Sequence, residues 1–178
     1  MSTEEDRKNL RGGCIGCLGI VGVLALVLIV GTMVYKSQPT SLNDASRYAQ
    51  RLHTLIYADA VAASFLAHAN EHSAGELYEV ARRMADDAGN FSSTIDAPSE
   101  FTESGNAFAK YANQLQDSYT KTANSLNNPS LERSYDMLRA IALDNRYTQE
   151  AIEAFKRDLA KSHFTSPEKR RILSRLVG

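Results

Sequence analysis

Two short motifs hold the residue types that could do chemistry. His68, Glu71 and His72 match H-x-x-E-H, the pattern of inverted zinc peptidases, in which two histidines hold zinc and the glutamate is the general base. The match fixes three positions, no third protein ligand is evident, and a helix start follows at Ser73. A polar helix end is the competing interpretation, so His68 and His72 are weak metal candidates, and no cofactor is predicted.

Cys14 and Cys17 form the second motif, a C-x-x-C. Redox chemistry places such a pair at a helix N-terminus in a thioredoxin-like fold, which the surrounding sequence does not predict. Small residues at the border of an apolar helix are the alternative, as is palmitate attachment in a eukaryote. The chain has no nucleophile with a visible base, no phosphate-binding glycine loop and no nucleic-acid module. It is therefore predicted not to be an enzyme and not to bind nucleic acid.

The elements around these motifs begin with an apolar run. No charged side chain occurs between Cys14 and Tyr35, and Lys36 closes the run. At about 1.5 Å per helical residue, this length spans about 30 Å, the thickness of a bilayer's hydrocarbon core. The run is longer than the apolar part of a signal peptide and lacks a small-residue cleavage site. Residues 14–36 are thus predicted to be an uncleaved transmembrane helix, and residues 1–13 a short tail.

The basic residues that flank this helix predict its orientation. The tail carries Arg7, Lys8 and Arg11, whereas the other side carries Lys36 and then no cation before Arg47. The positive-inside rule favours a cytoplasmic N-terminus and an extracytoplasmic C-terminal domain. The expected location is the cell membrane, and the composition, rich in Ala, Asp and Arg without Trp, is typical of a bacterial inner membrane protein.

Glycines gather on one face of the predicted anchor. Gly12, Gly16 and Gly19 share that face, and small residues at such spacings let a second helix approach closely. The predicted partner is a membrane protein or a second copy of this chain. The alternative is that glycine is simply frequent in membrane helices.

Beyond a hinge at residues 37–41, which contains Pro39, helical periodicity continues to residue 162. Ser41 and Ser73 resemble helix N-caps, and Gly89-Asn90 is expected to end the second helix. Such helices bury their apolar stripes against each other. The predicted fold is all-α: an antiparallel up-down bundle of four helices over residues 42–162, with a kinked three-helix arrangement as the alternative.

The predicted inner residues follow three- and four-residue spacings. In chain order they are Leu52, Leu55, Ile56, Ala63 and Leu66; Leu77, Val80, Ala81, Met84 and Ala88; Phe101, Gly105, Phe108, Ala112, Leu115, Tyr119, Thr122 and Leu126; and Leu131, Leu138, Ile141, Ile152, Phe155 and Leu159. Asp59, Asn145 and Thr148 interrupt these stripes. They form a buried polar layer that sets register, line a small ligand site, or face water.

The charge is unevenly distributed along the chain. Residues 37–160 hold 11 Lys/Arg against 17 Asp/Glu, a net charge of −6, whereas residues 161–178 have a net charge of +4. Residues 163–178 are predicted to form a short basic amphipathic helix that Ser166 caps and whose apolar side carries Ile172, Leu173, Leu176 and Val177.

The cations of this helix have two predicted uses. Lys169, Arg170, Arg171 and Arg175 are candidates for contact with an anionic partner or with lipid headgroups. Alternatively, the helix packs on the bundle and its cations are solvated or paired to the acidic body.

Taken together, the sequence predicts a single-pass accessory or interaction subunit of a membrane or cell-envelope complex. One alternative is an extracytoplasmic sensor bundle, because the architecture is similar to chemoreceptor ligand-binding domains, although those return through a second span. The other alternative is a small metal-binding protein that uses His68 and His72.

Overall fold

The computed structural model describes residues 39–127 and 146–177. Contacts divide the chain into residues 1–39 and 40–178, and almost all described residues belong to the second unit. The predicted anchor at residues 14–36, with Gly12, Gly16 and Gly19, lies outside the described residues. Within the described ranges, none of the helices has the length and apolar character needed to cross a membrane.

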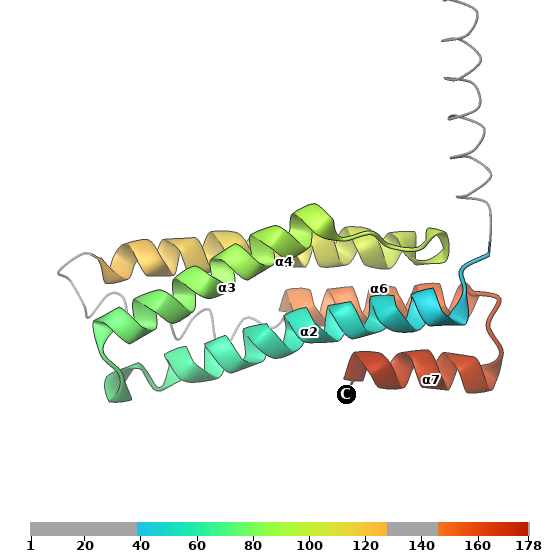
Figure 1. The fold of residues 1–178 in the computed structure, drawn as a ribbon, viewed down its shortest axis with the longest axis horizontal. Helices are drawn as coiled ribbons and strands as arrows, with labels where there is room; N and C mark the ends of the chain where they lie inside the picture. The colour runs from blue at the N-terminus through green and yellow to red at the C-terminus, as the bar shows by residue number, and fades with distance from the viewer. Residues whose placement is uncertain (1–38, 128–145, 178) are drawn as a thin grey trace, which may run out of the picture. The chain divides into compact units, whose positions relative to one another are not determined.

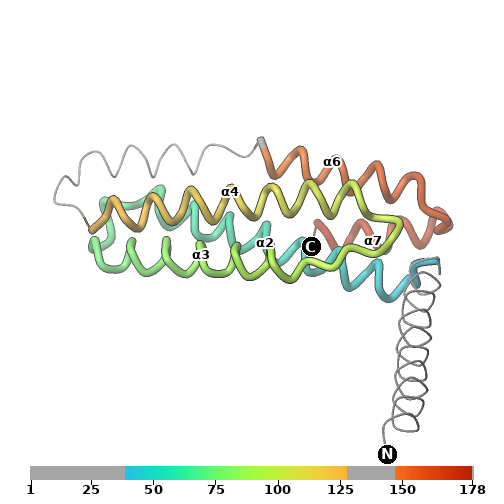
Figure 2. The backbone as a smooth tube through the Cα atoms, turned by 90° about the horizontal axis from the view of Figure 1, so that it is seen from above, coloured from blue at the N-terminus to red at the C-terminus, as the bar shows by residue number. Residues whose placement is uncertain are grey.

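The described part of the chain is entirely helical. Its elements are α2 (Leu42–Ala67), η1 (Ala69–Glu71), α3 (Ala74–Thr94), η2 (Ser99–Phe101), α4 (Thr102–Leu126), α6 (Arg146–Lys161) and α7 (Ser166–Val177). No strand occurs among these residues, so the prediction of an all-α bundle is confirmed. Successive α-helices run in opposite directions along the long axis (Figures 1 and 2). The first half of the predicted fourth helix lies outside the described residues.

Two predicted helix starts are confirmed by their hydrogen bonds. The Ser41 hydroxyl accepts a hydrogen bond from the Asp44 amide at 3.1 Å. Ser73 and Glu76 form a reciprocal capping box, in which each side chain bonds to the other residue's backbone amide. Such caps satisfy amides that the first helical turn leaves without intrahelical partners.

The predicted cap of the last helix was wrong by one residue. Thr165, rather than Ser166, precedes α7, and its amide and hydroxyl donate to the Glu168 carboxylate at 2.8 and 2.7 Å. Thr165 and Ser166 are both good caps by residue type. The three-residue spacing to Glu168 selects Thr165, because that spacing lets the glutamate reach back to the cap.

The predicted end of the second helix at Gly89-Asn90 is also wrong, because α3 continues to Thr94. Gly89 faces α4, where an added Cβ would lie 2.5 Å from the side-chain nitrogen of Gln116. Here glycine serves close packing between α3 and α4, and that packing outweighs the low intrinsic helix propensity of Gly and Asn.

The core largely follows the predicted stripes. Every predicted inner residue from Phe101 to Leu126 is buried. The stripe of α2 is rotated slightly from the prediction, since Ala62 is buried and Ala63 is half-buried. The rings of Tyr48, Phe101 and Phe155 form an aromatic cluster with centroids 5.2 to 6.2 Å apart.

Helix α7 packs against α2 within the same unit, with Ile172 and Leu176 buried. The basic segment at residues 163–178 is therefore not separate from the bundle. Val177, the last of the apolar residues that the sequence places on this helix, is 71% exposed.

Candidate functional site

A buried polar cluster joins α2 to α4. The Asp59 carboxylate accepts hydrogen bonds from the hydroxyls of Tyr111 at 2.5 Å and Tyr119 at 2.8 Å. Both tyrosines are buried, and the Thr148 hydroxyl from α6 forms a further hydrogen bond with Tyr111. One carboxylate thus accepts hydrogen bonds from two tyrosines that lie about two helical turns apart on α4.

The surroundings shift the acid–base behaviour of this cluster. Burial raises the pKa of Asp59 above its ordinary value, although the hydrogen bonds from Tyr111 and Tyr119 act in the opposite direction. Burial and the nearby Asp59 carboxylate raise the pKa of both tyrosines well above their usual range. The tyrosines therefore stay protonated and act as hydrogen-bond donors.

The sequence suggests three roles for Asp59, Asn145 and Thr148: a buried polar layer that sets helix register, a small ligand site, or contact with water. The observed geometry of Asp59 and Thr148 matches the buried layer. Asp59 and Thr148 lie on different helices and both contact Tyr111, whereas Asn145 lies outside the described residues. Each hydroxyl in the cluster has a partner, so no donor points into an empty site that a ligand would fill. Sequence reasoning missed Tyr111; its eight-residue spacing from Tyr119 was the available signal.

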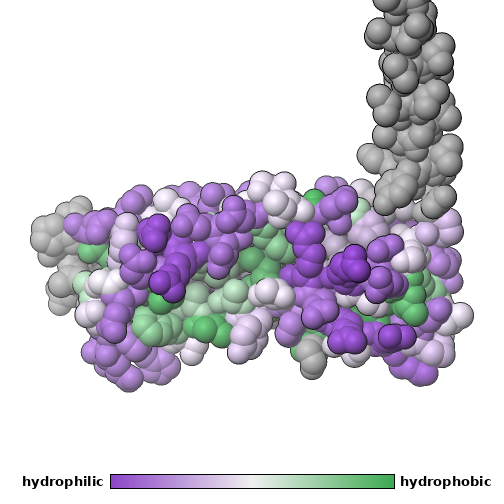
Figure 3. Space-filling model, viewed as in Figure 1, coloured by the Kyte–Doolittle hydropathy of each residue, from purple (hydrophilic) through white to green (hydrophobic). Residues whose placement is uncertain are grey.

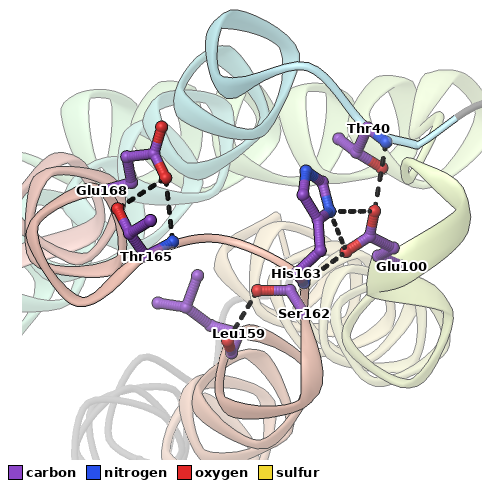
Figure 4. A network of polar contacts seen from close by, with 7 residues as sticks. All are labelled: Thr40, Glu100, Leu159, Ser162, His163, Thr165 and Glu168. Atoms are coloured by element: carbon purple, nitrogen blue, oxygen red, sulfur yellow. Dashed lines mark hydrogen bonds and ion pairs between the residues drawn. The ribbon is translucent and has the colours of Figure 1, made fainter.

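A second polar contact fixes the end of the bundle where the chain enters the second unit at Thr40. The Glu100 carboxylate accepts from the backbone amides of Thr40 and His163, at 3.1 and 3.2 Å. The imidazole Nδ1 of His163 lies 2.8 Å from the same carboxylate (Figure 4). The start of α2 and the α6–α7 loop are thereby held by one side chain.

Several effects compete at Glu100. Burial acts to raise its pKa, but the amides of Thr40 and His163, together with the His163 imidazole, outweigh it and lower the pKa below the ordinary value. Nearby, the buried Asp158 of α6 accepts from the Ser104 amide in the first turn of α4 at 2.7 Å. The Ser104 hydroxyl lies 3.1 Å from that of Tyr48, and burial raises the pKa of Tyr48 to about 12.

The two histidines of the H-x-x-E-H motif are not on successive turns of one α-helix. Helix α2 ends at Ala67, and the short η1 helix separates His68 from His72. His68 Nδ1 lies 2.9 Å from the Ser64 carbonyl oxygen, and the His72 ring stacks on Phe65 with centroids 3.7 Å apart. Among the described residues no group of three His, Cys, Asp or Glu side chains could hold a metal ion.

The outward face of α2 is unusual because it carries no Asp, Glu, Lys or Arg between Arg51 and Glu71. Asp59 is the one such residue in that interval, and it turns inward to the tyrosines. By contrast, the outward face of α3 is densely charged and includes exposed Glu79, Arg82 and Asp86. Surface helices ordinarily carry charged residues on the solvent side.

Large apolar side chains are exposed on this face. In the part of the chain that the structure describes, three are strongly exposed: Tyr57 (63%), Val61 (51%) and Val177 (71%). His53 links Tyr57 to the end of α7, because its ring stacks near that of Tyr57 and its Nδ1 lies 2.9 Å from the Leu176 carbonyl oxygen. We call Tyr57 and Val61 the apolar face of α2, whereas Val177 belongs to α7; Figure 3 shows apolar surface along the second half of α2.

The predicted cationic residues lie on α7. Lys169 donates to the Ala160 carbonyl oxygen at 2.8 Å and so ties the helix to the end of α6. Arg170, Arg171 and Arg175 are exposed, and no ion pair joins them to an acidic side chain of the described residues. Helix α7 therefore buries an apolar side on α2 and presents arginines outward, which combines parts of both sequence alternatives.

An open depression lies between α4 and α6. Its lining residues are Glu103, Ala107, Lys110, Tyr147, Gln149, Glu150, Glu153, Ala154 and Arg157. Several of its charges are already engaged: Arg157 pairs with Glu103 at 2.5 Å, and Lys110 lies 4.0 Å from Glu150. Since these charges pair with one another, the depression has no set of convergent groups typical of a ligand site.

Comparison with protein-family models, with curated proteins and with solved structures finds no match to this chain.

Proposed function

We propose that this protein is a non-enzymatic, single-pass membrane protein that holds a helical bundle on the extracytoplasmic side of the cell membrane. There it binds another subunit of a membrane or envelope complex. The apolar run at residues 14–36 supports the anchor, and the cations of the N-terminal tail support the orientation.

The observation that carries the binding role is the uncharged outward face of α2. Burying Tyr57 and Val61 against a partner removes apolar surface from water and requires no charge on α2 to be desolvated. Tyrosine is among the residues enriched at interaction hot spots, because it combines a large apolar area with a polar tip. The occupant that fits is an apolar, uncharged face of a helix from another subunit.

The test is a pull-down of the full-length chain in mild detergent, with the native mass measured by light scattering. A stoichiometric partner that is retained by the wild type and lost with Val61→Glu supports the proposal. The matched control is Arg83→Glu on the charged outward face of α3, which should retain the partner. A second variant, Gly16→Leu with Gly19→Leu, reports whether the anchor contributes independently.

Three outcomes contradict the proposal. A monomer without a partner removes the role of accessory subunit. A homodimer that Val61→Glu dissociates replaces the foreign partner with a second copy of this chain. Partner binding that survives Val61→Glu but fails with the glycine variants moves the interface from α2 to the anchor.

A further inference from the structure

We infer that the outward arginines of α7 form a docking surface for anionic phospholipid headgroups, which holds the bundle against the bilayer. This inference rests on the proposed membrane anchor and adds a second contact with the same membrane. The surface is defined by Arg170, Arg171 and Arg175.

The first step of the argument is the geometry of α7. Ile172 and Leu176 are buried against α2, so the helix has a fixed rotation on the bundle. With 3.6 residues per turn, Arg170 and Arg171 project about 140° and about 120° away from the mean direction of these two residues, and Arg175 projects about 80° away. All three arginines are exposed. The arginines are therefore presented together on a surface that the bundle does not cover, and Figure 3 shows strongly hydrophilic surface over α7.

The second step concerns where α7 begins. Thr40 and His163 bond to the same Glu100 carboxylate, at 3.1 and 3.2 Å, and α7 starts at Ser166. Only residues 37–39 separate Thr40 from Lys36, which closes the apolar run. Four extended residue steps reach at most about 14 Å. If residues 14–36 span the bilayer, the chain itself delivers the start of α7 to the headgroup region.

The third step is charge. Glu168 is the one acidic residue of α7, and its carboxylate is occupied by the Thr165 cap. The rest of the unit is acidic, because residues 37–160 have a net charge of −6. An anionic membrane surface therefore attracts α7 and repels the acidic rest of the unit. This electrostatic interaction favours the orientation of the bundle in which α7 faces the membrane.

A modest attraction is enough because the protein is tethered. Each basic residue near an anionic membrane strengthens binding roughly fivefold, so three arginines supply about 100-fold. For a free protein this is weak. An anchor that keeps α7 within a short distance of the headgroups converts the contact into an intramolecular equilibrium at high effective concentration.

The anionic surface is assigned to lipid rather than to an acidic protein because of this short connection. A partner protein would have to arrive by diffusion, whereas the headgroups are within reach of the chain at all times. An acidic protein is the competing outcome of the experiment below.

The experiment uses the full-length chain in lipid nanodiscs. The natural chain contains no Trp, so Val177→Trp provides a single donor for energy transfer to a dansyl group on the lipid headgroups. Nanodiscs of phosphatidylcholine alone are compared with nanodiscs that contain about 30% phosphatidylglycerol. A second probe, Ala74→Trp at the start of α3, lies at the end of the bundle opposite to the start of α7 (Figure 1).

The expected result is greater energy transfer from Trp at position 177 in the anionic nanodiscs, with little change for the probe at position 74. Changing Arg170, Arg171 and Arg175 to Gln should return the signal to its level in neutral lipid, as should high salt. The control that removes the same charge elsewhere changes Arg82, Arg83 and Lys156 to Gln and should leave the lipid dependence in place.

Equal transfer in both lipids, or transfer that survives the triple α7 substitution, overturns the inference. A signal that responds only when an acidic protein is added assigns α7 to that protein and also overturns it. Release of the chain from membranes by alkaline carbonate would show that there is no anchor, and both proposals would then fail. A retained anchor without lipid-dependent transfer overturns only the role of α7.

Discussion

The buried Asp59 cluster offers the sharpest test of the structure. Asp59→Ala removes the carboxylate that accepts two hydrogen bonds and leaves the buried Tyr119 hydroxyl with one long contact, at 3.5 Å, to the backbone carbonyl oxygen of residue 59. A buried polar group without a partner costs about 1–3 kcal/mol. Tyr111 keeps its contact with Thr148, and the substitution also relieves the cost of burying a carboxylate. We therefore expect a net loss of about 1–2 kcal/mol in the free energy of unfolding.

The assay is thermal unfolding of the full-length chain in mild detergent, followed by circular dichroism. For a domain of this size the expected loss lowers the Tm by roughly 3–6 °C. Asp59→Asn should cost less, because an amide can accept from one tyrosine and donate to the other. The matched control is Asp87→Ala on the exposed face of α3, where the change should stay within about 0.5 kcal/mol.

The pH dependence of the same variants gives an independent check. Because its pKa is raised, Asp59 keeps its proton to a higher pH in the folded protein than in the unfolded chain, where its pKa has the ordinary value of 3.8. From that value upward, the folded state binds more protons, so the contribution of Asp59 to stability falls as pH rises. Wild type should therefore gain stability relative to Asp59→Asn as the pH is lowered through this window.

Two results would refute this account of the cluster. If Asp59→Ala unfolds at the same temperature as the Asp87→Ala control, the tyrosine hydroxyls do not depend on Asp59. If the difference between wild type and Asp59→Asn does not change with pH, the carboxylate is not buried as described.

Two further predictions concern packing and the end of the bundle. Gly105→Ala should lower stability by about 1–3 kcal/mol, because its Cβ would lie 2.6 Å from that of Ala97. Gly75→Ala, with no atom within 4 Å of its Cβ, should instead be neutral or stabilising in the same thermal unfolding assay. The lowered pKa of Glu100 stabilises the fold above its ordinary pKa of 4.5, and that stabilisation is lost as pH falls through the lower, folded value. Glu100→Gln should therefore weaken the loss of stability in acid, whereas an unchanged acid profile would show that the contact with His163 and Thr40 contributes nothing.

Local signals in the sequence were sufficient for several features. The Ser73–Glu76 capping box is complete within four residues, so its pattern depends on nothing distant. The stripe from Phe101 to Leu126 kept a regular spacing over the whole of α4, and each of its positions is buried. A long periodic stripe averages over local errors, which is why it was predicted more reliably than individual helix ends.

The features that were missed depend on residues far apart in the chain. Gly89 considered alone predicts a helix end, but in the structure it allows the close approach of Gln116 on the facing helix. Glu100 and His163 are 63 positions apart, and neither belongs to a local motif. The exposed face of α2 was overlooked because Asp59 gave the helix a charge in the sequence, and only the tyrosines of α4 reveal that this charge points inward.

The Asp59 cluster and the apolar face of α2 are physically connected, although they lie on opposite sides of the helix. Residues two positions apart on an α-helix project about 160° away from one another, so Tyr57 and Val61 point outward when Asp59 points inward. The two tyrosine hydroxyls fix the rotation of α2 at this position, because any turn of the helix breaks both hydrogen bonds at once. A polar cluster in this position costs more to bury than an apolar one, but it specifies a single rotation, which an apolar contact between smooth helix surfaces does not. In the proposed function, the cluster therefore contributes to partner binding without contact with the partner, by holding the uncharged face of α2 toward the subunit that covers it.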